Sequence, residues 1–171
     1  MPEFIPLIPE DEIKNKVREI GQQISKDYKG KDLVLVGILK GSFIFLADLT
    51  RQISVDHEID LIGASSYDGA NSTGQIVFTK QPDLDLKGRD VLLVEDIVDT
   101  GNTLTKIVEF VQLLEPNSVA ICSLIDKKER RDNDVKVDYA CFSLEKGFLV
   151  GYGLDYNEHY RNLPAIFDLK L

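Results

Sequence analysis

The 171-residue sequence lacks several features that identify particular classes of protein. It contains no tryptophan and only two cysteines, and no uninterrupted apolar stretch approaches the roughly 20 residues that span a bilayer. It contains neither the P-loop string Gly-x-x-x-x-Gly-Lys-Ser/Thr nor the dinucleotide-binding string Gly-x-Gly-x-x-Gly. These absences exclude a transmembrane helix and argue against two common ways of binding nucleotides.

The two cysteines, Cys122 and Cys141, both lie in apolar, strand-like sequence. Such positions are typical of buried, reduced thiols rather than of a disulfide or a metal site. At the start of the sequence, Met1-Pro2-Glu3-Phe4 includes no basic segment leading into an apolar run, so no secretory signal is predicted. We therefore expect a cytoplasmic protein.

Positive charge is scarce, because 20 Lys and Arg residues stand against 29 Asp and Glu residues, for a net charge of −9. Affinity for DNA, RNA or an anionic membrane comes mainly from basic side chains that neutralise phosphates. We therefore expect neither a nucleic-acid partner nor a membrane partner. Taken at face value, the balance also disfavours strongly anionic ligands, although it is compatible with a small polyanion held by backbone N–H groups and a few cations.

The order of apolar patterns predicts the fold class. Three short, unbroken apolar runs are typical of strands that are covered on both faces, as in a parallel sheet. They alternate with three segments in which apolar residues recur at helical spacing. The runs are residues 33–39, 91–94 and 119–125, and helices are predicted over 11–28, 42–53 and 103–115. This alternation predicts a single α/β domain over residues 1–171, with a mostly parallel central sheet flanked by helices.

Two segments fall outside that alternation. The polar, glycine-containing stretch from Ser65 to Gly74 separates two predicted strands, residues 58–63 and 75–80. It is interpreted either as a hairpin connection or as a mobile lid, since it is longer than a tight turn requires. The charged stretch from Asp126 to Asp134 predicts an exposed loop.

Three acidic residues follow the buried run that begins at Val91. Glu95 and Asp96 are adjacent, and Asp99 precedes a short turn that opens the next predicted helix. Ligands of open α/β sheets gather at the carboxyl ends of strands, which is where these side chains are expected. One acid would suffice to cap a helix, and the others would repel one another, so the cluster indicates a functional site.

The turn over residues 100–103 has the groups that bind a phosphate monoester. Successive N–H groups of a glycine-containing turn form an anion-binding nest, to which a helix N-terminus adds a favourable dipole. The hydroxyls of Thr100 and Thr103 add donors, and a carboxylate at Glu95 or Asp96 can accept hydrogen bonds from ribose hydroxyls. The segment therefore predicts a cradle for a ribose 5-phosphate, the alternative being a capped helix with a charged, solvent-exposed edge.

The residues from Val94 to Thr103, Val-Glu-Asp-Ile-Val-Asp-Thr-Gly-Asn-Thr, resemble the signature with which purine phosphoribosyltransferases bind 5-phosphoribosyl 1-diphosphate (PRPP). In order and spacing, the motifs resemble the hypoxanthine-guanine phosphoribosyltransferase family in its short bacterial form, over about residues 5–168. Further matching segments are Leu39-Lys40-Gly41, Ser66-Tyr67, Leu124-Ile125-Asp126-Lys127 and Phe148 to Glu158, followed by Arg161.

The resemblance implies a fold and an activity. The fold is that of the type I phosphoribosyltransferases, with a small hood built from about residues 1–10 and 145–171 and a flexible lid over about residues 65–75. The activity is purine salvage, in which the 5-phosphoribosyl group of PRPP passes to N9 of hypoxanthine or guanine. The products are IMP or GMP and diphosphate.

The resemblance also implies a role for each matched residue. Asp99 is the catalytic base or acid at purine N7, and Lys127 donates to the exocyclic O6. Phe148 stacks on the purine, while Leu149 and Asp155 lie beside it. The ribose 5-phosphate is bound by Glu95, Asp96, Asp99, Thr100, Gly101, Asn102 and Thr103; the diphosphate by Lys40, Gly41 and Arg161; the cofactor Mg²⁺ by Glu95, Asp96 and Asp155; and the lid carries Ser66 and Tyr67.

Three further expectations follow from the resemblance. Relatives have a cis non-proline peptide in the diphosphate loop, which corresponds to the bond between Lys40 and Gly41. Asn102 stands where some relatives carry a basic residue, which leaves the backbone nest intact. Relatives are dimers or tetramers, so we expect a homo-oligomer.

The alternative to an enzyme is a regulatory PRPP-binding protein that binds nucleic acid. Such a protein needs a basic face, for which residues 127–131 offer the one small basic cluster.

Overall fold

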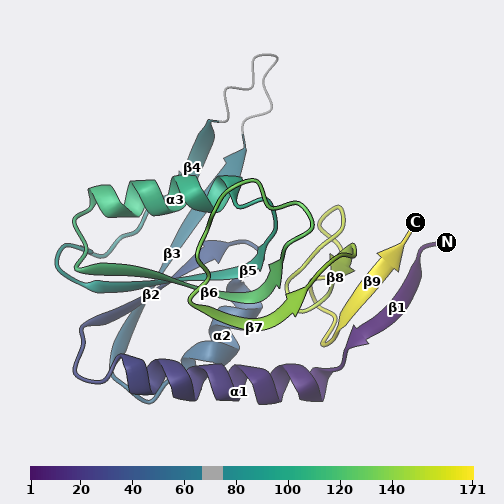
Figure 1. Cartoon of the computed structure of the whole chain (residues 1–171), viewed down its shortest axis with the longest axis horizontal. Helices are drawn as coiled ribbons and strands as arrows, with labels where there is room; N and C mark the ends of the chain where they lie inside the picture. The colour runs from purple at the N-terminus through teal and green to yellow at the C-terminus, as the bar shows by residue number, and fades with distance from the viewer. Residues whose placement is uncertain (67–74) are drawn as a thin grey trace.

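The computed structural model describes residues 1–66 and 75–171, and its central element is a six-stranded sheet (Figure 1). Its strands are β2 (Leu33–Leu39), β3 (His57–Ser66), β4 (Ile76–Lys80), β5 (Asp90–Val98), β6 (Ser118–Lys127) and β7 (Tyr139–Leu144). They lie in the order β4-β3-β2-β5-β6-β7, and all neighbours are parallel except β3 and β4. The predicted α/β fold with a mostly parallel sheet is confirmed.

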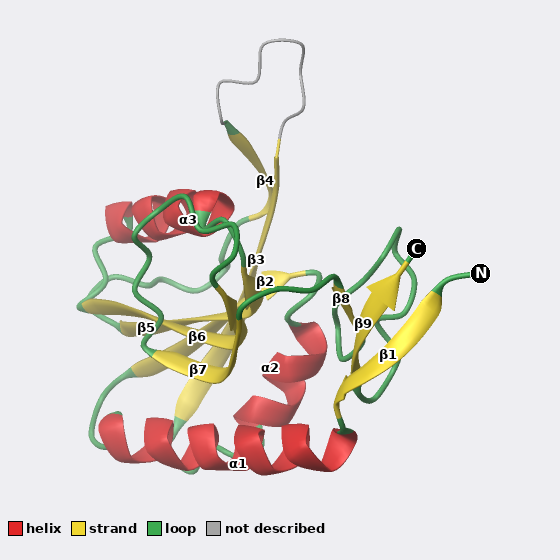
Figure 2. Cartoon of the chain, turned by 45° about the vertical axis from the view of Figure 1, so that its right-hand side comes forward, coloured by secondary structure: helices red, strands yellow, loops and turns green. Residues whose placement is uncertain are grey.

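Helices cover both faces of this sheet (Figure 2). They are α1 (Glu10–Asp27), α2 (Phe43–Thr50) and α3 (Asn102–Leu113). The helices α1 and α2 lie on one face, and α3 lies on the other. Within the described part of the chain, no helix is long and apolar enough to cross a bilayer.

The packing of β2 explains why its sequence is apolar without interruption. Successive side chains of a strand point to opposite faces. Leu33 and Leu35 pack in the core beneath α1 and α2, whereas Val34 and Val36 pack in the core beneath α3. All four side chains are buried, so a strand covered on both faces leaves no position for a polar residue.

A second, three-stranded antiparallel sheet lies beside the ends of β6 and β7 (Figures 1 and 2). It consists of β1 (Glu3–Ile8), β9 (Ile166–Lys170) and β8 (Leu149–Val150), in the order β1-β9-β8. The two ends of the chain therefore lie next to each other. Short strands such as β8 leave little periodicity in the sequence, and none of these three was predicted.

Both cysteines are buried and unpaired, which confirms the prediction of reduced thiols. Burial raises the pKa of the Cys122 thiol well above its usual range and that of Cys141 to about 12. Because the thiolate is the reactive form, both side chains behave as small apolar groups at neutral pH.

Two strands continue further than the sequence predicted. β5 runs to Val98, so Glu95 and Asp96 lie within the strand rather than after it. β6 runs to Lys127, and the prediction of an exposed loop from Asp126 onward is wrong for its first two residues. Asp126 pairs with Val98 of β5, so polar residues such as Glu95 and Asp126 belong to the paired part of the sheet.

Candidate active site

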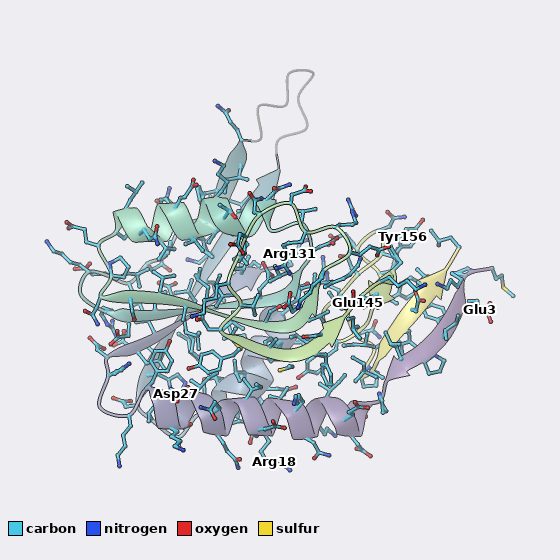
Figure 3. The ribbon with its side chains drawn as sticks, in the orientation of Figure 1. Glu3, Arg18, Asp27, Arg131, Glu145 and Tyr156 are labelled. Atoms are coloured by element: carbon cyan, nitrogen blue, oxygen red, sulfur yellow. The ribbon has the colours of Figure 1, made fainter. Side chains whose placement is uncertain are left out.

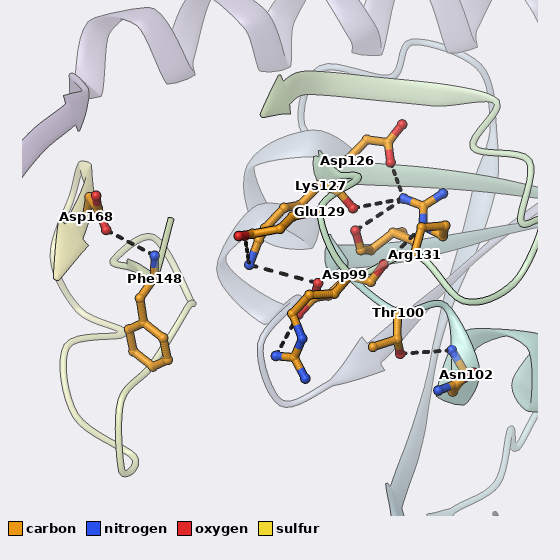
Figure 4. A network of polar contacts seen from close by, with 11 residues as sticks. Asp99, Thr100, Asn102, Asp126, Lys127, Glu129, Arg131, Phe148 and Asp168 are labelled. Atoms are coloured by element: carbon orange, nitrogen blue, oxygen red, sulfur yellow. Dashed lines mark hydrogen bonds and ion pairs between the residues drawn. The ribbon is translucent and has the colours of Figure 1, made fainter. Parts of the chain in front are cut away.

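The catalytic candidates meet where β5 and β6 end (Figure 4). Asp99 follows β5, and Lys127 is the last residue of β6, with a side chain only 9% exposed. The Lys127 Nζ lies 3.9 Å from Asp99 Oδ1, and an Arg130 guanidinium nitrogen lies 3.5 Å from Asp99 Oδ2. The buried Oδ1 of Asp99 has no hydrogen-bond partner among the described residues. The pair thus offers a ligand one cation and one free acceptor.

The turn after Asp99 has the geometry of an anion site. Gly101 adopts a left-handed conformation with φ of 83° and precedes α3, where a side chain would be strained. The Asn102 N–H donates to Thr100 Oγ1 (3.2 Å), and the Thr105 N–H donates to the Gly101 carbonyl (2.9 Å). The first N–H groups of a helix lack partners within the helix, so the turn presents donors and a positive dipole end. Binding of a phosphate by this turn stays a prediction.

The adjacent acids Glu95 and Asp96 interact with each other within β5. The Asp96 N–H donates to Glu95 Oε1 (3.0 Å), and the Ile97 N–H donates to Asp96 Oδ1 (2.7 Å). Burial, together with the negative charge of Asp96, raises the pKa of Glu95 well above its usual range, and burial raises the pKa of Asp96. The two acids therefore resist carrying negative charge at the same time, and a nearby cation or hydroxyl donor would favour their charged forms.

The loop after β2 lies directly against this acid pair. A Cβ at Gly41 would overlap the Asp96 carboxylate, so only glycine allows the two segments to approach this closely. The cis peptide bond of this loop joins Leu39 to Lys40, so the expectation of a cis bond between Lys40 and Gly41 is wrong by one residue. The carbonyl of Gly41 is packed against Gly153.

The two cations predicted to bind diphosphate lie in one ion-pair network. Lys40 pairs with the Glu158 carboxylate, and Arg161 lies 3.2 Å from both Glu158 and Asp155. Arg161 also donates to the Gly153 carbonyl (2.7 Å), while its buried Nε has no partner among the described residues. The structure thus brings Lys40 and Arg161 together, with carboxylates of the same chain between them.

Of the predicted purine-binding residues, Lys127 ends β6, Leu149 lies in β8, and Phe148 and Asp155 lie on either side of β8. Phe148 is 48% exposed, and its N–H donates to Asp168 Oδ1 (3.0 Å). Figure 4 shows Phe148 across from Lys127 and Asp99. Leu149 is buried in β8, so only its backbone is available to a ligand.

The predicted metal ligands do not form one cluster. No group of three His, Cys, Asp or Glu side chains surrounds a common point within residues 1–66 and 75–171. Asp155 pairs with Arg161 instead of joining Glu95 and Asp96. Mg²⁺ usually keeps several waters and needs only one or two carboxylates with substrate phosphates, so the oxygen donors of the Glu95–Asp96 pair fit it. Of the predicted lid residues, Ser66 ends β3 and Tyr67 lies outside the described residues.

Two residues at the site were missed by sequence reasoning. Arg131 donates to the backbone carbonyls of Val98, Asp99 and Lys127. Glu158 pairs with both Lys40 and Arg161. Neither residue was singled out, because Arg131 is one of four cations in five residues and Glu158 ends a matched segment without an assigned role. With Lys127 buried and Arg131 bonded inward, the cluster 127–131 is not a free basic face, which removes support for nucleic-acid binding.

Comparison with known families agrees with this geometry. Residues 9–157 match the model of the phosphoribosyl transferase domain family, the class of protein that the sheet, the acid pair and the phosphate turn define.

Three relatives narrow the class. The chain is 51% identical to the hypoxanthine phosphoribosyltransferase of Escherichia coli strain K12 over 163 residues, which are 94% of this chain and 92% of the relative. It is 46% identical to the hypoxanthine-guanine phosphoribosyltransferase of Streptococcus pneumoniae over 165 residues, or 96% and 92% of the two chains. A crystal structure of a hypoxanthine phosphoribosyltransferase from Staphylococcus aureus superimposes with a TM-score of 0.92 at 45% identity, covering 96% and 90%. The chain belongs to the hypoxanthine phosphoribosyltransferase family.

Proposed function

We propose that the protein is an enzyme of purine salvage that transfers the 5-phosphoribosyl group of PRPP to N9 of hypoxanthine or guanine. The products are IMP or GMP and diphosphate. One observation carries this proposal: the unpartnered carboxylate oxygen of Asp99 lies beside the ammonium group of Lys127, next to the phosphate turn. Membership of the family and the names of the relatives support the same reaction.

At the base, a donor and an acceptor suit a 6-oxopurine. Lys127 donates to O6, and Asp99 accepts the hydrogen at N7, within the reach that general acid–base catalysis requires. As N9 bonds to the anomeric carbon, the bond from that carbon to diphosphate breaks, and the carboxylate of Asp99 stabilises or takes the N7 proton. The exposed ring of Phe148 stacks on the purine.

At the sugar, the phosphate and the hydroxyls are bound separately. The N–H groups and hydroxyls of residues 100–103 hold the 5′-phosphate, with the dipole of α3 directed at it. Glu95 and Asp96 accept hydrogen bonds from the ribose hydroxyls, which relieves part of their mutual repulsion.

At the diphosphate, the leaving group takes the place of internal carboxylates as the partner of the cations. Lys40, the Gly41 backbone and Arg161 bind the leaving group, with Arg161 able to engage two oxygens at once. Glu95 and Asp96 would hold one Mg²⁺ and Asp155 would belong to a second site, where the ions would neutralise charge on that leaving group.

Three wider properties belong to the same proposal. The loop that carries Ser66 and Tyr67 closes over the site during transfer and excludes water from the anomeric carbon. The enzyme is a cytoplasmic homo-oligomer, either a dimer or a tetramer. Light scattering coupled to size-exclusion chromatography tests the oligomer, and a monomeric mass would contradict it.

The substitution Asp99→Asn tests the role of Asp99. Asparagine keeps the shape but cannot accept the N7 proton as a base, so we expect turnover with hypoxanthine to fall by about 100-fold or more. Binding of PRPP, measured by calorimetry, should stay within about threefold, because the nest and the cations are unchanged. Turnover equal to that of the unmodified protein would show that Asp99 is not the proton-transfer group.

A further inference from the structure

Arg131 binds the ends of two neighbouring strands at once (Figure 4). Its guanidinium donates to the carbonyls of Val98 (3.3 Å) and Asp99 (3.0 Å), which end β5 and begin the phosphate turn. It also donates to the carbonyl of Lys127 (3.2 Å) at the end of β6, and it pairs with the Asp126 carboxylate. The side chains of Arg131 and Asp126 are only 18% and 13% exposed.

These contacts begin where the β-sheet ladder stops. The last pair between β5 and β6 joins Val98 to Asp126, after which one chain turns into α3 and the other enters the charged loop. The β5–β6 ladder does not continue beyond this pair, although the Lys127 backbone still pairs with Leu144 of β7. The planar guanidinium of Arg131 bonds to both chains at this point.

The residues after Arg131 extend the connection to the phosphate turn. The N–H groups of Asp132 (2.9 Å) and Asn133 (3.3 Å) donate to the carbonyl of Thr100. The side chain of Asn102 bonds to both Asp132 and Asn133. The loop therefore contacts the turn on its backbone as well as through side chains.

We propose that Arg131 is a positioning residue that sets the distance between the phosphate turn and Lys127. The inference rests on the proposed function, because its consequence concerns a nucleotide whose phosphate and purine reach the two places together. A ligand that occupies two subsites gains affinity over its halves only if both can be engaged simultaneously. Arg131 provides that gain without touching the ligand.

Lysine cannot replace this geometry. Arginine presents five N–H donors in one rigid plane, whereas lysine has three donors on one rotatable nitrogen. The substitution Arg131→Lys keeps the charge opposite Asp126 but cannot bond to the Val98, Asp99 and Lys127 carbonyls together. This one variant therefore keeps the positive charge at position 131 and removes the planar arrangement of hydrogen-bond donors.

Three ligands measured by calorimetry test the proposal. Ribose 5-phosphate occupies the turn, inosine occupies the purine side, and IMP occupies both. In Arg131→Lys we expect IMP to bind about tenfold more weakly, while each half-ligand changes by less than about threefold. We also expect kcat to fall by about 100-fold, since small misplacement of reacting groups has effects of that size.

The controls separate positioning from stability. Lys128→Gln removes an exposed cation of the same loop, and it should leave all three affinities unchanged. Asp126→Asn, whose amide oxygen still accepts from Arg131, should weaken IMP selectively by about threefold, and it decides the question if Arg131→Lys does not fold.

Two results would overturn the proposal. One is an unchanged ratio of IMP affinity to half-ligand affinities in the variants, even with a lower melting temperature. The other is a loss that falls on ribose 5-phosphate as strongly as on IMP, which would make Arg131 a local support of the turn. An unmodified protein that fails to bind IMP would instead refute the proposed function, and this inference with it.

Discussion

The two ends of the site that are proposed to bind anions differ in how their side chains are paired. At the phosphate end, the loop that contains Arg131 donates hydrogen bonds to the turn after Asp99, mostly to its backbone carbonyls. At the diphosphate end, the two cations Lys40 and Arg161 are paired with Glu158. The first end is ready for a ligand, whereas the second must exchange an internal carboxylate for one.

The exposure of the groups shows how large this difference is. Lys40 and Glu158 have side chains that are 66% and 61% exposed, and such ion pairs contribute only about 0–1 kcal/mol. Under the proposed function, diphosphate therefore displaces Glu158 from Lys40 at little cost. IMP and PRPP distinguish the two ends, because both carry a 5′-phosphate and PRPP alone carries a diphosphate.

The largest effect is expected from Arg161→Gln. Charge-assisted hydrogen bonds contribute about 1.5–3 kcal/mol each, so the affinity for PRPP should fall by about 100-fold. The affinity for IMP, which lacks diphosphate, should change by less than about threefold. Calorimetry with both ligands measures the difference.

Arg18→Gln is the matched control for this prediction. Arg18 lies on the exposed side of α1, away from Arg131 and the site (Figure 3), and its removal should leave both affinities unchanged. Equal losses for PRPP and IMP in Arg161→Gln would contradict the assignment of Arg161 to the diphosphate.

Gly101→Ala should act at the other end. A left-handed backbone costs an alanine about 1–2 kcal/mol, and its Cβ would lie 3.0 Å from Val135, so the turn must shift. We expect PRPP and IMP to bind about tenfold more weakly, because both depend on the phosphate turn.

Gly88→Ala provides the control for that strain. Gly88 has φ of 71°, and a Cβ at this position would meet nothing within 4 Å, so a similar backbone cost arises away from the turn. The melting temperature of Gly88→Ala should fall by about as much as that of Gly101→Ala, while the affinities for PRPP and IMP stay unchanged. Weakened binding in both glycine variants would show that general destabilisation, rather than the turn, is responsible.

Glu158→Gln is expected to have a smaller effect of the opposite sign. Removing this carboxylate frees Lys40 and leaves Arg161 paired with Asp155 alone, so inorganic diphosphate and PRPP should bind about threefold more tightly. The affinity for IMP should not change. Glu145→Gln, which removes an exposed acid outside the network (Figure 3), should alter neither ligand, and weaker diphosphate binding in Glu158→Gln would mean that Glu158 supports the cations.

The smallest effect concerns stability. Burial and the Asp96 charge raise the pKa of Glu95, so the folded protein holds its proton more tightly than the unfolded chain does. Stability is then lost as the pH rises from the unfolded pKa toward the folded one. The free energy of unfolding of Glu95→Gln should therefore be about 1 kcal/mol higher than that of the unmodified protein at pH 8 in Mg²⁺-free buffer. Urea titrations should show that this difference decreases toward pH 5.

A destabilised Glu95→Gln protein would contradict that account of the acid pair. Asp85→Asn serves as the control, because Asp85 is an exposed acid whose carboxylate, within residues 1–66 and 75–171, accepts a hydrogen bond only from the Lys87 N–H. Its unfolding free energy should change by less than about 0.5 kcal/mol at either pH.

Sequence patterns predicted the three helices and five of the six strands of the central sheet, but not β7. Strands such as β2 are covered on both faces, and their sequences are therefore apolar without interruption. Such patterns could not predict β8, a strand of two residues whose pairing depends on β9 far along the chain. Short elements of this kind are determined by tertiary contacts rather than by local pattern.

The candidate site was only partly readable from the sequence. The turn around Gly101 has local chemistry, a glycine between hydroxyl residues before a helix, and it was found. Lys127 was assigned to an exposed loop, although its backbone pairs with Leu144 and its side chain is buried. Arg131 could not be singled out, since its role depends on carbonyls 32 and 33 residues earlier that the fold alone brings within reach.

A turnover assay with PRPP, Mg²⁺ and each of four purine bases tests the central claim most directly. Lys127 as donor to O6 and Asp99 as acceptor at N7 predict IMP from hypoxanthine and GMP from guanine, with adenine inactive because its 6-amino group is a donor where Lys127 needs an acceptor. Xanthine measures how the 2-position is read. Formation of AMP at a rate equal to that of IMP, or no transfer to hypoxanthine or guanine, would contradict the account.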